Sequence, residues 1–185
     1  MILYRCFAWN ERARADQPDS PLWFPRVFQG DGRHDNPDAY GCLYLTEREA
    51  SAVVEQFARF RGQRLTEPML IRRKQPLALA AIELPDDADL VDLDDPVVLR
   101  RRRLRPSQVA TRDRSVTQPQ ALAVYRDTEA VGLRWWSIFE SLWANYTIFD
   151  RAGSALAVED VRRLSLEDTV VREAADYLGL RVSSG

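Results

Sequence analysis

The sequence has little of what builds metal centres, disulfides or membrane spans. It holds one histidine, His34, and two cysteines, Cys6 and Cys42, among 185 residues. Four-ligand zinc spacing is therefore excluded, and the cysteines are expected to be small core residues. No apolar run approaches the roughly 18 residues of a membrane helix, and the N-terminus does not resemble a secretory signal. We expect no metal, no membrane contact and a cytoplasmic location.

An excess of either charge sign is also lacking. There are 26 basic and 28 acidic side chains, for a formal net charge of −2. This balance argues against direct binding of nucleic acid. Charge is nevertheless concentrated where Arg100–Arg103 and Arg105 follow an acidic stretch over residues 86–95. We expect a solvated loop whose charges compensate each other, and an anionic partner at the arginines is the alternative.

The common signatures of nucleotide binding and acyl transfer are absent as well. The sequence contains no Rossmann fingerprint, P-loop or Gly-x-Ser-x-Gly elbow. Ser137 and Ser141 are candidates for a nucleophile only if His34 meets them in space, and nothing in the sequence favours this.

Hydrophobic periodicity predicts an α+β domain of short strands and few helices. A loop over residues 10–38 is expected to dock Phe24, Val27 and Phe28 on the core. The first helix should begin at an N-cap Thr46 and end near Gly62, and the second should start at Thr117 and Pro119. A third should run from Ser165 to Gly179. The expected strands are 2–9, 41–45, 69–71, 77–84 (after a break at Pro76), 90–93, 132–136 and 146–149.

Several short motifs occur in a fixed order along the first 150 residues. Arg33, Tyr44 and Glu55 follow one another at spacings of 11 residues. The motifs are Tyr4-Arg5, the segment Gly32-Arg33-His34-Asp35-Asn36-Pro37, the strand residues 41–45, Val54-Glu55, Gly132-Leu133-Arg134-Trp135-Trp136-Ser137, and Asn145 to Asp150. Together they resemble the RES family of NAD-consuming toxin domains.

The resemblance implies a fold and an activity. The fold would be an ADP-ribosyltransferase-like split β-sheet core with flanking helices. A catalytic domain would span residues 1–155, with residues 156–185 as a helical extension packed on it. RES domains cleave the nicotinamide–ribose bond of NAD with water or phosphate as acceptor, and need no cofactor beyond NAD as substrate. They commonly act as toxins neutralised by an antitoxin that carries a DNA-binding module. The sequence does not decide the oligomeric state of the chain, and a homodimer is one possibility.

The resemblance also implies roles for single residues. Arg33 and Arg5 would hold phosphate or ribose oxygens, because a guanidinium offers a planar charged fork. Tyr44 would stack on nicotinamide, and Glu55 would stabilise positive charge at the anomeric carbon. Tyr4 and Ser137 complete the nucleotide-binding set, Ser137 through the nicotinamide amide or Glu55. Trp135, Trp136 and Trp143 are expected in the core. His34, beside Arg33, is expected to be a loop histidine, and a supporting role next to the site is the alternative.

The sequence departs from the family at two places. His34-Asp35 stands where an aromatic residue followed by Asn is usual, and the loop between Trp9 and Gly30 is long. These departures leave open whether substrate preference or activity is altered. The alternatives are a protein ADP-ribosyltransferase and an inactive module that binds a nucleotide or a partner.

Overall fold

The chain folds into two compact units in a computed structural model that describes residues 1–14 and 17–183. Unit 1 comprises residues 24–45 and 84–156 with Met1, and unit 2 comprises residues 2–23, 46–83 and 157–185. Both units combine strands with helices, so the expected α+β class is confirmed. Within the described part of the chain, no helix combines the length and apolar character needed to cross a membrane.

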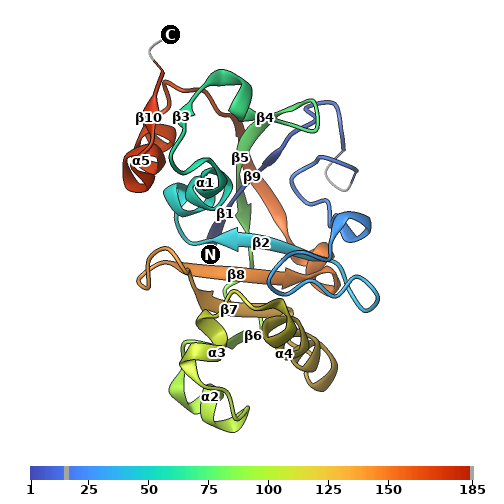
Figure 1. The fold of residues 1–185 in the computed structure, drawn as a ribbon. Coiled ribbons are helices and arrows are strands. Elements are labelled where there is room, and N and C mark those ends of the chain that lie inside the picture. The colour runs from blue at the N-terminus through green and yellow to red at the C-terminus, as the bar shows by residue number, and fades with distance from the viewer. Residues whose placement is uncertain (15–16, 184–185) are drawn as a thin grey trace. The chain divides into compact units, whose positions relative to one another are not determined.

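Unit 1 is built on a sheet in the order β2-β8-β7-β6 (Figure 1). The strands are β2 (Cys42–Thr46), β6 (Leu90–Asp92), β7 (Gly132–Trp136) and β8 (Ala144–Phe149). β7 runs antiparallel to β8 and parallel to β6. At Gly132 an added Cβ would lie 2.4 Å from the carbonyl oxygen of Thr147, so only glycine lets β7 approach β8 this closely.

Helices α2 (Pro96–Arg101), α3 (Pro106–Ala110) and α4 (Arg114–Asp127) gather beside β6 and β7 in Figure 1. The 3-10 turns η1 (Arg26–Phe28) and η4 (Asp150–Ala155) complete unit 1. Its buried core joins side chains of the helices to side chains of the strands: Tyr40, Cys42, Leu93, Leu99, Val109, Ala121, Val124, Leu133, Trp135 and Phe149.

Unit 2 is centred on β5 (Gln75–Glu83), which pairs antiparallel with β1 (Ile2–Ala8), β4 (Ile71–Arg72) and β9 (Ala157–Arg163). Helices α1 (Glu49–Phe57) and α5 (Thr169–Leu178) pack against each other. A small parallel pair joins β3 (Arg64–Leu65) to β10 (Arg181–Val182). The 3-10 turns η2 (Ala58–Phe60) and η3 (Glu67–Leu70) connect these elements.

Several predictions are confirmed in unit 2 and at the cysteines. The apolar face of α5, with Val171, Ala174 and Ala175 as its centre, is buried. Gly179 ends the helix in the left-handed conformation at φ 67°, which glycine adopts without steric cost. Cys6 and Cys42 are free and buried, and burial raises the pKa of the Cys6 thiol to about 12.

Helix starts were predicted at the wrong residues. The N-cap of α1 is Arg48, and Thr46 ends β2 with its hydroxyl donated to the Arg48 carbonyl. Asp113 caps α4 four residues before Thr117, which leaves Pro119 inside the helix. Ser165 also lies outside α5, because Asp168 is the N-cap.

The strand and loop predictions were wrong at four further places. Pro76 does not break its strand, because β5 begins at Gln75. Residues 67–70 form the 3-10 turn η3 instead of a strand. Val27 and Phe28 do not dock on the core, since they are 83% and 69% exposed. The arginine-rich segment predicted as a loop contains α2 and α3.

Candidate active site

The loop that carries Arg33 is organised by the buried carboxylate of Asp35. Its Oδ2 accepts hydrogen bonds from the backbone N–H groups of Gly30 and Gly32, at 2.8 and 2.7 Å. A Cβ on Gly32 would lie 2.4 Å from Oδ1 of Asp35, so this carboxylate occupies the space of a side chain there. The Gly-Arg opening of the motif is thus a loop closed on the carboxylate that follows it.

Tyr44, on β2, joins the same network. Its hydroxyl donates to Oδ1 of Asp35 at 2.7 Å and accepts the backbone N–H of His34 at 2.9 Å. Burial raises the pKa of Tyr44 well above 10.0, and the nearby thiol of Cys42 and carboxylate of Asp35 add to the rise. The phenol therefore stays neutral and acts as a donor to Asp35. Its ring packs against the core of unit 1.

Arg33 is 6% exposed and lies over the Trp135 ring, with 4.7 Å from Cζ to the ring centroid. Its Nη1 donates to the carbonyl oxygens of Val109 and Thr111, at 2.7 and 2.5 Å. These carbonyls belong to the end of α3 and the residues after it. The guanidinium thus fastens the α3 region to the loop while its charge stays beside an aromatic face.

His34 is 2% exposed, and its Nδ1 lies 2.8 Å from the hydroxyl of Thr147. That hydroxyl already accepts the indole N–H of Trp135 at 3.1 Å, so its own hydrogen is available for Nδ1. Burial lowers the pKa of His34 well below 6.5, and the charges of Arg33 and Arg114 lower it further. The imidazole is therefore neutral in the folded chain.

Ser137 lies just beyond the end of β7 and is 2% exposed. Its backbone N–H donates to the Trp143 carbonyl at 2.8 Å, and its hydroxyl accepts the Phe139 N–H at 3.2 Å. The residue shapes the turn toward β8. Trp135 and Trp143 are buried, as predicted, and Trp136 is partly buried.

The other predicted site residues belong to unit 2. Tyr4 and Arg5 lie on β1, opposite Ala81 and Ala80 of β5. The Arg5 guanidinium donates to the carbonyls of Pro21 and Ser20, at 2.5 and 3.3 Å, so it holds the 17–23 segment against the strand. Arg33, Tyr44 and Ser137 are thus brought into unit 1, and Tyr4 and Arg5 into unit 2.

Glu55 is also in unit 2, on α1. The helix buries Val54 and Phe57 completely, whereas Glu55 is exposed. Its carboxylate therefore projects from the exposed, polar side of the helix.

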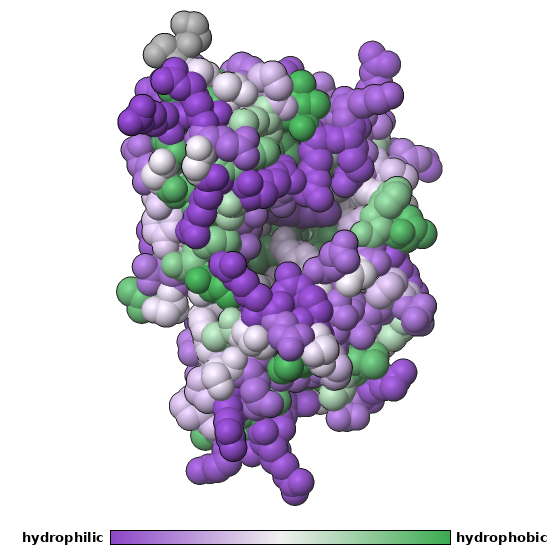
Figure 2. Space-filling view, viewed as in Figure 1, coloured by the Kyte–Doolittle hydropathy of each residue, from purple (hydrophilic) through white to green (hydrophobic). Residues whose placement is uncertain are grey.

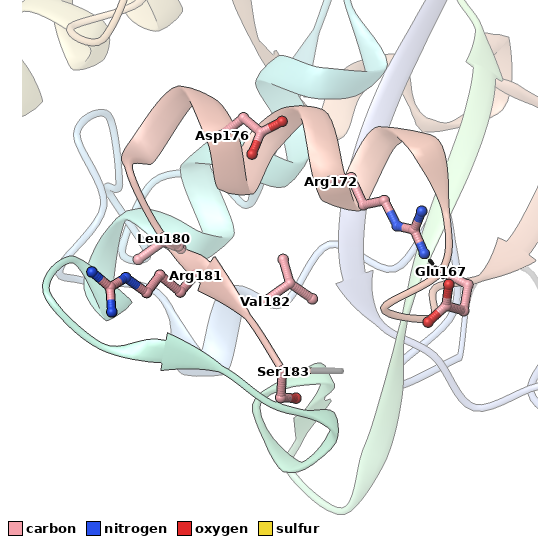
Figure 3. Close-up of a pocket in the computed structure, with 7 residues that line it drawn as sticks. All are labelled: Glu167, Arg172, Asp176, Leu180, Arg181, Val182 and Ser183. Carbon is pink, nitrogen blue, oxygen red and sulfur yellow. Dashed lines mark hydrogen bonds and ion pairs between the residues drawn. The ribbon is translucent and has the colours of Figure 1, made fainter. Parts of the chain in front are cut away.

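Each unit has a depression in its surface. In unit 1, a cavity of about 420 Å³ lies between the Asp35–Ala39 segment and α4, where Gln118 and Arg126 line it. In unit 2, a groove of about 620 Å³ lies between α5 and β10 (Figure 3). Figure 3 shows Arg172 of α5 pointing at Glu167, with which it forms an ion pair, and Val182 on β10. No group of three or more His, Cys, Asp or Glu placed to hold a metal occurs among the described residues.

The contacts that Asp35 and Thr147 make were not predicted from the sequence. Asp35 appeared only as a departure from the family pattern, although it organises the loop and binds Tyr44. A usable signal was its place after Gly30 and Gly32, because an Asp close to glycines commonly accepts backbone N–H groups in turns. Thr147 gave no signal, since its partners His34 and Trp135 are distant in sequence.

Comparison with known proteins identifies the family of the chain and a structure of similar fold. Residues 2–169 match the RES domain family. A chain from the crystal structure of the M. tuberculosis MbcT–MbcA toxin–antitoxin complex is similar in fold, with a TM-score of 0.65 and 19% sequence identity. The similarity covers 97% of this chain and 88% of that chain. None of the curated proteins matches in sequence. Because the family match spans nearly all of the sequence, the chain belongs to the RES domain family.

Proposed function

We propose that this chain cleaves the bond between nicotinamide and ribose in NAD, with water or phosphate as acceptor. The observation that carries the proposal is that Arg33 and Tyr44, on the segment that matches the family, are each held by hydrogen bonds. Tyr44 donates to Asp35, and Arg33 donates to the carbonyls of Val109 and Thr111. These hydrogen bonds leave little conformational freedom to Arg33 and Tyr44, and preorganised groups lower the cost of binding a ligand.

The chemistry requires stabilisation of positive charge. When the nicotinamide–ribose bond breaks, positive charge develops at the anomeric carbon, and a carboxylate stabilises it. In this proposal Glu55 supplies that carboxylate, and nicotinamide leaves as a neutral base. Arg33, Arg5 and Tyr4 hold the nucleotide, Tyr44 stacks on nicotinamide, and Ser137 meets its amide. NAD is the substrate, and no further cofactor takes part.

We also propose that the chain is the toxin of a toxin–antitoxin pair, with an antitoxin that carries a DNA-binding module as its partner. Two findings support this: membership of the RES family, and the likeness in fold to a chain of a toxin–antitoxin complex. Under this proposal, loss of NAD from the cell is the toxic event.

The test is the release of nicotinamide from NAD by the purified chain. Glu55→Gln should lower the turnover by about 100-fold or more, the usual size for a lost charge-stabilising group. Glu47→Gln is the matched control, because Glu47 is an exposed glutamate near the same helix and outside the family motifs. Undiminished turnover of Glu55→Gln would refute its role, and no release by the unaltered chain would refute the activity.

The acceptor is identified in the same assay with and without phosphate. Phosphate-dependent release indicates a phosphorylase, and release without phosphate indicates a glycohydrolase. NAD labelled on the ADP-ribose part separates both from a protein ADP-ribosyltransferase, because only the transferase leaves label on a macromolecule. Binding of NAD without turnover would favour an inactive nucleotide-binding module.

A further inference from the structure

A cluster of exposed arginines on unit 1 takes no part in the network described above. Residues 96–112, which form α2, α3 and their connections, hold six arginines and no acidic residue. Arg100, Arg101, Arg103 and Arg105 are exposed, and we name these four the basic patch. The surface over α2, at the bottom of Figure 2, is mostly hydrophilic, with long side chains projecting from it.

The acidic stretch before α2 does not neutralise this patch, contrary to the sequence-based expectation. Asp92 and Asp94 pair with Arg134 on β7, at 3.0 and 3.4 Å. Asp95 caps α2 by accepting the Val97 N–H at 2.7 Å. Asp86 pairs with the N-terminal amine at 2.5 Å.

No ion pair joins the basic patch to an acidic side chain within residues 1–14 and 17–183. Four positive charges are therefore left exposed together on one short segment. Like charges held this close repel each other, and a bound anion relieves that repulsion.

Arg103 adds an independent observation. It follows the C-cap of α2 with φ 57°, in the left-handed region where glycine is usual. The Leu104 N–H returns to the Leu99 carbonyl at 2.9 Å, so the helix ends in a tight reversal. The backbone of an arginine in this conformation is strained, because its Cβ crowds the neighbouring carbonyl oxygen. The reversal nevertheless places Arg105 only a few residues after the end of α2.

We propose that the basic patch binds a short acidic segment of a partner protein. Guanidinium groups pair with carboxylates through two parallel hydrogen bonds, which single lysines cannot do. Val97, which is 50% exposed, lies one helical turn before Arg101 and offers an apolar contact beside the charges. The patch thus fits a peptide that alternates carboxylates with an apolar side chain.

The surroundings of the patch disfavour a long polyanion. Asp87, Asp89 and Asp94 are exposed on the segment that leads into α2, and the chain as a whole carries a net charge of −2. A nucleic-acid duplex presents phosphates continuously and would meet these carboxylates as well as the arginines. A short acidic segment carries few enough charges for the four arginines to pair.

The experiment measures binding of a short labelled peptide of Asp, Glu and Leu to the full chain at physiological salt. A peptide with Asn and Gln in place of the acids is the ligand control. The triple variant Arg100→Glu, Arg101→Glu, Arg105→Glu should weaken binding by about tenfold or more. Arg12→Glu, Arg64→Glu, Arg163→Glu is the matched control, since it changes the net charge equally at exposed arginines of unit 2.

The proposal holds if the acidic peptide binds, the neutral one does not, and only the patch variant loses affinity. Equal losses in both triple variants would overturn it, because they would reflect net charge alone. Tighter binding of a DNA duplex than of the peptide would also overturn it. So would self-association that the patch variant abolishes, since the occupant would then be a second copy of the chain. Nicotinamide release enters none of these readouts, so the outcome is independent of the proposed enzyme activity.

Discussion

Tyr44 donates its hydroxyl hydrogen to Oδ1 of Asp35 at 2.7 Å and receives the backbone N–H of His34 at 2.9 Å. The same carboxylate receives two backbone N–H groups of the loop before it. Strand β2 and the loop that carries Arg33 are therefore held together by a closed set of hydrogen bonds around one buried carboxylate. The site depends on Asp35 as much as on the residues that match the family motif.

Replacement of Asp35 by alanine should lower the free energy of unfolding by about 2–3 kcal/mol. The change leaves two backbone donors and the Tyr44 hydroxyl without their acceptor in a buried place. Urea unfolding, followed by circular dichroism, measures the loss. Asp35→Asn should recover part of it, because the amide oxygen still accepts from the loop.

Asp38→Ala serves as the control for this change, since Asp38 is an exposed aspartate of the same loop. Its effect should stay within about 0.5 kcal/mol. If Asp35→Ala were no more destabilising than Asp38→Ala, the carboxylate would not organise the loop.

Elements with strong local signals could be predicted from the sequence. β1, β7 and β8 are rich in β-branched and aromatic residues, and α5 shows its apolar stripe together with a terminal glycine. The family motifs also named Arg33 and Tyr44, and the structure fixes each by hydrogen bonds in unit 1: Arg33 to the Val109 carbonyl, and Tyr44 to Asp35 and the His34 N–H.

The failures arose where tertiary structure overrides local preference. Pro119 suits a first helical turn, but Asp113 caps α4 earlier and the helix accommodates the proline at an exposed position. The two short helices α2 and α3 were not predicted, because the run of arginines was interpreted as a loop. Asp95-Pro96 is nevertheless a usable signal for the start of α2. β9 is a mostly charged edge strand that gains its structure from pairing with β5.

Stability should depend on pH through His34, the one histidine of the chain. The pKa of His34 in the folded chain lies well below its ordinary 6.5. Between these two values the unfolded chain binds a proton at His34 and the folded chain does not. The contribution of His34 to the free energy of unfolding is therefore complete above pH 6.5. It is lost as the pH falls from 6.5 toward the pKa of the folded chain, by up to about 1.4 kcal/mol per pH unit. Urea midpoints measured from neutral pH toward acid should show this slope, and His34→Gln should flatten it. Parallel slopes in both proteins would show that His34 is not held neutral.

Arg103→Gly should stabilise the chain, although it removes a charged side chain from the surface. Glycine adopts the φ of 57° without the Cβ clash, which costs an arginine about 1 kcal/mol. Thermal unfolding should show the increase, and Arg101→Gly, inside α2, should show a decrease of similar size.

If acidic peptides bind the basic patch, Arg103→Gly should also weaken that binding while it raises stability. Opposite signs for the two measurements would mean that Arg103 stabilises binding at the expense of the fold, and a loss of both would show that the reversal after α2 needs the arginine itself.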